Sequence, residues 1–189
     1  MQKLLQTLIA FIFLTSPAFS APREYVIDHA ASRLNFNYLF NDDPIKGRFP
    51  DFKAKLLLDF KDFNKSDISL TIDTRSAKGG FVFATTALRG PKILHAKKFP
   101  EIHFQSKSVR LTKSGAELAG TITVRKTSRP ITLKVQFLQL AGQAPQDRTK
   151  LALRITGRLN RHDFGASGYP KMVGENLDID VLAYISRKP

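Results

Sequence analysis

The chain has 189 residues, of which 42% are hydrophobic and 24% charged, and its formal net charge is +14 at pH 7. It contains no cysteine, which excludes disulfides, thiolate catalysis and Cys-ligated metals. The positive charge favours anionic partners through long-range attraction. Nucleic acid is not an expected partner, because the basic stretches hold few of the aromatic residues on which bases stack.

The first twenty residues have the pattern of a cleavable secretory signal. Lys3 gives a positive start, residues 4–14 are almost wholly apolar, and the small residues Ala18 and Ser20 occupy the positions that a signal peptidase reads. The apolar run is shorter than the ~20 residues that a membrane-spanning helix needs. We therefore predict export to the periplasm with cleavage after Ser20. One mature domain would remain over residues 21–189, where loss of Lys3 lowers the net charge from +14 to +13.

Alternation of apolar and polar side chains dominates the mature sequence. It runs through eight segments: 34–40, 56–60, 68–73, 102–107, 118–125, 131–137, 151–159 and 177–185. Each segment reads as a strand with one buried and one wet face, which is typical of antiparallel sheets. Turn signals rich in glycine, proline and polar residues separate several of them. The pattern predicts an all-β domain, either a barrel or a sandwich.

One segment, residues 85–98, shows no alternation. Its apolar positions are Ala87, Leu88, Ile93 and Leu94. They would form a stripe on one or two helical turns, but Gly90-Pro91 must interrupt the helix because proline does not fit a helix interior. We predict two short helical pieces that lie across one mouth of a barrel.

Five short motifs of the chain follow one another in an order and spacing that is known from a protein family. They are residues 25–28 (YVID), 45–49 (IKGRF), 88–100 (LRGPKILHAKKFP), 129–133 (RPITL) and 160–165 (NRHDFG). In this order the chain resembles the YceI-like family of exported proteins. The resemblance implies an eight-stranded antiparallel lipocalin-like barrel whose interior binds a polyisoprenoid or a related long-chain lipid. It implies neither catalysis nor a cofactor.

The chain departs from the family before the long connection. The family often has Arg-Asp-x-His-Leu there, whereas residues 84–88 read Ala-Thr-Thr-Ala-Leu. The charged residues and the histidine are missing, and this stretch helps to shape one barrel mouth. The sequence therefore leaves open which ligand enters and whether a polar head is read there.

The interior of such a barrel is either filled by its own side chains or holds one ligand. Fifteen phenylalanines and no tryptophan give an apolar wall that suits a hydrocarbon chain better than a polar metabolite. Gly120, Gly157 and Ala183 fall on the inward face, where we expect them to leave room. The predicted ligand-binding residues are Phe36, Tyr38, Phe40, Leu88, Leu94, Phe104, Ile122, Leu133, Val135, Phe137, Ile155, Phe164 and Ile179.

The residues that could carry chemistry are scattered. The histidines are His29, His95, His103 and His162. They have no metal-ligand spacing, and no G-x-S-x-G turn supplies a nucleophile. We expect His103 to point outward and Asp163 to bond nearby backbone amides. The chain is therefore predicted not to be an enzyme and to hold no metal.

A second hypothesis remains beside the lipid carrier. A barrel with a filled core could act as a basic surface adaptor that binds an anionic membrane or an envelope protein. The net charge and Lys92, Lys97 and Lys98 support it. The sequence does not settle the oligomeric state or the identity of the ligand.

Overall fold

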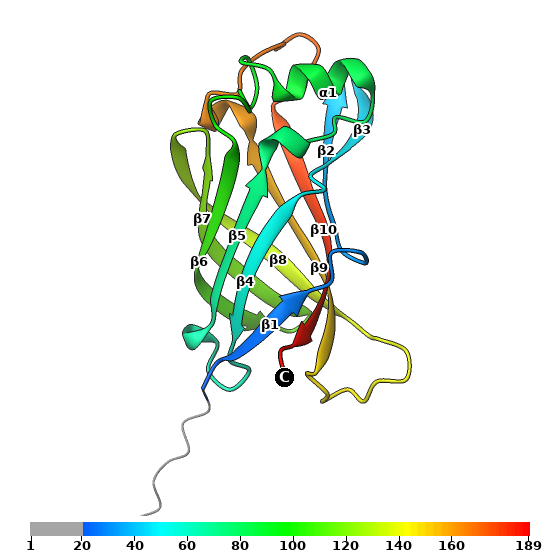
Figure 1. Ribbon diagram of the computed structural model, residues 1–189, viewed down its shortest axis with the longest axis vertical. Helices are drawn as coiled ribbons and strands as arrows, with labels where there is room; N and C mark the ends of the chain where they lie inside the picture. Colours follow the sequence, from blue (N-terminus) through cyan, green and yellow to red (C-terminus); the bar gives the residue numbers. More distant parts are fainter. Residues whose placement is uncertain (1–20) are drawn as a thin grey trace, which may run out of the picture.

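A computed structural model describes residues 21–189 of the chain, so the predicted secretory signal lies outside the described residues. The strands are β1 (Arg23–Ile27), β2 (Arg33–Phe40), β3 (Asp43–Arg48), β4 (Phe52–Leu58), β5 (Asp67–Asp73), β6 (Glu101–Thr112), β7 (Gly115–Val124), β8 (Thr127–Leu138), β9 (Lys150–Asn160) and β10 (Asn176–Arg187). The helical elements are α1 (Val82–Arg89) and the short 3-10 turns η1 (Phe63–Lys65), η2 (Thr74–Ser76) and η3 (Arg161–Phe164). Figure 1 shows the strands wrapped into a barrel with α1 across one end.

The sheet closes on itself because β10 pairs on both of its edges. Neighbouring strands of the sheet follow the order β1-β4-β5-β6-β7-β8-β9-β10. One edge of β10 pairs with β9, and its other edge pairs with β1 and β2. Residues 28–32 separate β1 from β2, so these two segments form one interrupted strand of the wall. In the same way β3 pairs with β2 while β4 pairs with β1, and together they form the next strand. The ten segments thus make the predicted eight-stranded antiparallel barrel, which is confirmed.

The sequence pattern and the strands agree in detail. Each of the eight predicted segments overlaps one strand, β2 or one of β4 to β10. Burial alternates along β7 from Gly115 to Gly120, as expected for a wall with one face turned inward. The pattern misses β1 and β3, because these short segments hold few apolar residues on the inward face.

The helical prediction for residues 85–98 is partly wrong. The helix α1 begins earlier, at Val82, and ends at Arg89. The second predicted piece is a series of turns: His95 has a left-handed φ of 53°, and its N–H donates to Gly90 O at 2.8 Å. A residue at positive φ cannot continue a right-handed helix, so the chain folds back after Gly90 instead of forming a second one.

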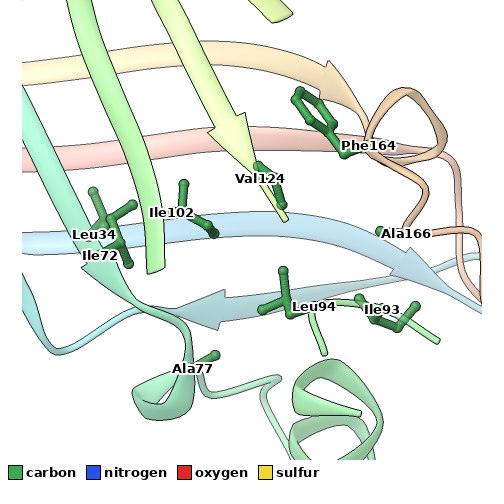
Figure 2. Close-up of a cluster of buried hydrophobic side chains, with 9 residues drawn as sticks. All are labelled: Leu34, Ile72, Ala77, Ile93, Leu94, Ile102, Val124, Phe164 and Ala166. Atoms are coloured by element: carbon green, nitrogen blue, oxygen red, sulfur yellow. The ribbon is translucent and has the colours of Figure 1, made fainter. Parts of the chain in front are cut away.

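The connection between β5 and β6, residues 74–100, lies across part of one end of the barrel, which we call the α1 end. Ile93 and Leu94 of this connection belong to one buried cluster with Leu34 and Ile102 from the wall. Figure 2 shows the whole buried cluster: Leu34, Ile72, Ala77, Ile93, Leu94, Ile102, Val124, Phe164 and Ala166. Among residues 21–189 no helix has the length and hydropathy needed to cross a membrane.

Candidate ligand cavity

An apolar cavity occupies the interior of the barrel. Its volume is about 310 Å³, which falls in the ~300–1,000 Å³ range of ligand sites. The wall is built by side chains from every strand except β3, together with α1, the connections at the α1 end and the β4–β5 connection at the other end. Since successive residues of a strand point to opposite faces, the alternation in the sequence places these apolar side chains inside.

The interior is not filled by its own side chains. Leu70, Ile122, Ile155 and Ile179 belong to the central barrel and line the cavity, yet each is only partly buried. Well-packed interiors leave few voids larger than a water molecule. The part of these side chains that stays accessible faces the cavity. This open space does not agree with the filled core of the adaptor hypothesis.

All thirteen residues predicted from the sequence lie on the cavity wall. Phe36 and Tyr38 come from β2, Ile179 from β10, and Leu88 from α1. They therefore share one apolar surface although they are spread over most of the chain. Their role in binding a ligand remains a prediction.

The expected room beside the glycines is occupied by neighbouring strands. A Cβ atom at Gly157 would lie 2.5 Å from Leu133 Cδ2. A Cβ atom at Gly120 would lie 2.6 Å from the Phe104 ring. The prediction that these glycines open the cavity is therefore wrong: each makes space for a side chain across the sheet. Ala183 differs, because it does line the cavity.

Tyr38 and Arg161 line the cavity at the α1 end, and their polar groups bond to the protein. The Tyr38 hydroxyl donates to Gly79 O at 2.6 Å, and burial raises the pKa of this phenol. The guanidinium of Arg161, which is 3% exposed, also lies on the wall. Burial lowers its pKa, although arginine still remains protonated in proteins.

Arg161 is a buried cation held by backbone carbonyls. Its Nε donates to Gly174 O at 2.8 Å, and its Nη2 donates to Val173 O at 2.8 Å. Its Nη1 donates to Gly168 O at 2.8 Å and also to Ala166 O. These four bonds fix the connection from η3 to β10 over the end of the barrel. The role of Arg161 was not predicted from the sequence, although the residue lies in the NRHDFG stretch that marks the family resemblance.

The local bonds around η3 correct one prediction. Asn160 Oδ1 accepts from the His162 backbone N–H at 2.9 Å, so Asn160 caps the turn, as Asn commonly does. Asp163 is exposed and does not cap this turn. The carboxamide one residue before Arg161 takes the role that we expected of the carboxylate.

The histidines lie apart from one another. His103 points outward, as predicted, with its Nε2 3.2 Å from Glu101 Oε2. His29 packs on Phe52 with ring centroids 4.9 Å apart. Within residues 21–189 no three His, Cys, Asp or Glu residues are grouped as metal ligands. None of the four histidines, all in the described part of the chain, lies on the cavity wall.

The cavity reaches exposed side chains at both ends of the barrel. Phe83 of α1 lines it and is 53% exposed; Phe137, near the far end of β8, lines it and is 42% exposed. Neither exposure could be read from the alternation of the sequence. Phe137 was predicted as an inward residue, whereas Phe83 was missed because it lies before the segment treated as helical.

A sequence profile of the YceI-like domain matches residues 25–184. The UPF0312 protein of Pseudomonas putida (strain F1) is 28% identical over 156 residues, covering 82% of this chain and 77% of that protein. Protein YceI of Salmonella arizonae is 26% identical over 161 residues, covering 84% and 83%.

Two solved structures share the fold. BcnA of Burkholderia cenocepacia has a TM-score of 0.74 and 17% identity, covering 85% of this chain and 99% of that chain. A polyisoprenoid binding domain from Saccharophagus degradans has a TM-score of 0.66 and 12% identity, covering 88% and 99%. At this level of identity the likeness concerns the barrel itself.

Proposed function

Because the chain belongs to the YceI-like family and its barrel encloses an apolar cavity, we propose that it is a periplasmic carrier for a long-chain lipid. The ligand is a polyisoprenoid or a fatty-acid-like chain held inside the barrel. The proposed activity is binding and transfer without catalysis.

The cavity wall carries this proposal. Almost every side chain that lines it is aliphatic or aromatic, and the polar groups of Tyr38 and Arg161 are bonded to backbone carbonyls. Such a wall offers no array of free polar groups for a sugar or a nucleotide. A hydrocarbon chain gains about 0.8 kcal/mol per buried methylene, so ten buried methylenes contribute about 8 kcal/mol, which is of the same order as the cost of the freedom lost on binding.

Two further observations support the ligand class and the compartment. One structural neighbour is named as a polyisoprenoid binding domain, which favours a prenyl chain over a fatty acid. The secretory pattern before Ala21 supports export. Sequencing of protein recovered from the periplasm should find Ala21 as the first residue. A soluble mature protein that still began with Met1 would contradict this localisation.

The ligand itself is tested by native mass spectrometry of protein purified without detergent. We expect a bound mass that extracts into organic solvent. Delipidated protein should then take up the prenol solanesol more tightly than palmitate. A protein that carries no extractable mass and takes up neither compound would overturn the carrier proposal.

A further inference from the structure

A cluster of exposed apolar side chains lies at the α1 end, and we call it the wedge. It consists of Phe81, Val82 and Phe83, which are 38%, 84% and 53% exposed. Phe81 is the N-cap residue of α1, and Val82 and Phe83 begin the helix. Figure 1 shows the β2–β3 tip beside α1 at the top of the barrel. Contiguous exposed apolar residues commonly mark a surface that meets a protein or a membrane.

The wedge is continuous with the ligand cavity. The ring of Phe81 packs edge-on against Phe40 at a centroid distance of 5.3 Å, and Phe40 lines the cavity. Phe83 belongs to both surfaces, because it lines the cavity and is more than half exposed. An apolar chain that meets the wedge therefore finds an apolar path into the barrel.

The charges around the wedge are predominantly positive. The connection over residues 74–100 carries Arg75, Lys78, Arg89, Lys92, Lys97 and Lys98 and contains no Asp or Glu. All of these cations are exposed except Arg89, which is half-buried. Arg75 is paired with Asp73 at 2.7 Å, and Asp42 and Asp43 lie in the β2–β3 turn, so the positive charge of this end comes from the other cations of the connection and from Arg125 and Lys126 in the β7–β8 turn. The α1 end thus presents apolar side chains flanked by a cationic segment.

We propose that the wedge docks on an anionic lipid bilayer, so that the ligand passes between the membrane and the cavity at the α1 end. This inference rests on the proposed carrier function. A bilayer fits better than a protein partner because apolar side chains flanked by Lys and Arg match the acyl and headgroup layers of an anionic membrane. Long-chain lipids reside in bilayers, and the wedge leads directly to the cavity.

The test variant is the double substitution Phe81→Ser with Val82→Ser, because neither residue lines the cavity. Sedimentation with vesicles of phosphatidylglycerol and phosphatidylcholine should show binding about ten-fold weaker than that of the parent, since binding scales with the buried apolar area. Transfer of cis-parinaric acid from these vesicles should slow by a similar factor. Uptake of the same probe from dilute ethanol should stay unchanged.

A matched control exists at the other end of the barrel. Leu111 and Leu138 are 53% and 38% exposed, they do not line the cavity, and they lie near the far ends of β6 and β8. The double substitution Leu111→Ser with Leu138→Ser removes similar apolar surface there. It should leave vesicle binding and transfer unchanged. A loss equal to that of the wedge variant would show that the α1 end is not the docking face.

Salt and vesicle composition supply the electrostatic arm of the test. Binding of the parent should fall when salt rises from ~0.1 M to ~1 M, because the Debye length shrinks from about 10 Å to about 3 Å. Vesicles of phosphatidylcholine alone should bind more weakly. If the parent takes up the probe from ethanol but ignores anionic vesicles, the docking proposal fails and the carrier proposal stands. If it takes up neither this probe nor solanesol, the carrier proposal fails.

Discussion

At the scale of single residues, the shape of the cavity depends on how side chains of neighbouring strands fill the space beside small residues. Leu133 lies over Gly157, and the Phe104 ring lies over Gly120. Ala183 differs, because its side chain lines the cavity. A larger side chain at residue 183 would therefore extend into the ligand volume, whereas one at residue 157 would strike Leu133.

We expect Ala183→Phe to lower the amount of bound lipid severalfold while the melting temperature changes little. In a filled core, overpacking costs about 1–3 kcal/mol, but the cavity offers room for the ring. The control is Leu182→Phe, whose side chain points to the opposite face of β10. Lipid retained per protein and thermal unfolding are measured on both variants. A lower melting temperature of Ala183→Phe with an unchanged amount of bound lipid would contradict the prediction that the ring enters the ligand volume.

A second expectation concerns the buried cation. Arg161→Met removes the donors of four carbonyl groups, and buried groups left unsatisfied cost about 1–3 kcal/mol each. The free energy of unfolding, measured with urea, should fall by at least about 3 kcal/mol. Arg161→Lys keeps the charge but lacks the planar fork of donors, so it should rescue only part of the loss. Full stability in the Met variant would mean that these bonds contribute little.

At the scale of elements, period-two alternation was sufficient to predict eight wall strands and the inward residues that line the cavity. It could not predict β3, where Gly47 is buried beneath the ring of Phe36, because that contact depends on cross-strand register. The start of α1 was missed for another reason. Phe81, Val82 and Phe83 are apolar and yet exposed. Their sequence therefore lacks the alternation of buried and exposed residues on which the prediction depended.

The β2–β3 pair offers a test of that register. A Cβ atom at Gly47 would lie 2.1 Å from Phe36 Cζ, so Gly47→Ala must displace the ring. We expect a loss of about 1–3 kcal/mol in the free energy of unfolding. Phe36→Leu removes the distal ring atoms, so Gly47→Ala should cost less in that background than in the parent. Chemical denaturation of both single variants and the double variant gives the coupling, and strictly additive losses would contradict the close contact between these two residues.

At the scale of the whole molecule, an open interior makes stability depend on occupancy. A ligand that binds only the folded barrel adds about 2.7 kcal/mol when its free concentration is one hundred times Kd. Delipidated protein should therefore melt at a lower temperature than protein purified with its ligand, and added solanesol should restore the difference. Melting temperatures that are the same with and without lipid would indicate that the cavity is not the binding site.

The ring of strands closes through β1 and β10, where Tyr25 faces Arg187 and Ile27 faces Ile185. These partners come from opposite ends of the described chain. Bringing β1 and β10 together therefore closes a long loop, which costs entropy before the contacts between the two strands form. The barrel cannot close while only its first strands are present, because β10 is needed to join β9 to β1 and β2. A chain that stops before Asn176 would leave β1, β2 and β9 with unpaired edges, which invite association with other chains. Completion of β10 thus decides between a closed barrel and an aggregate.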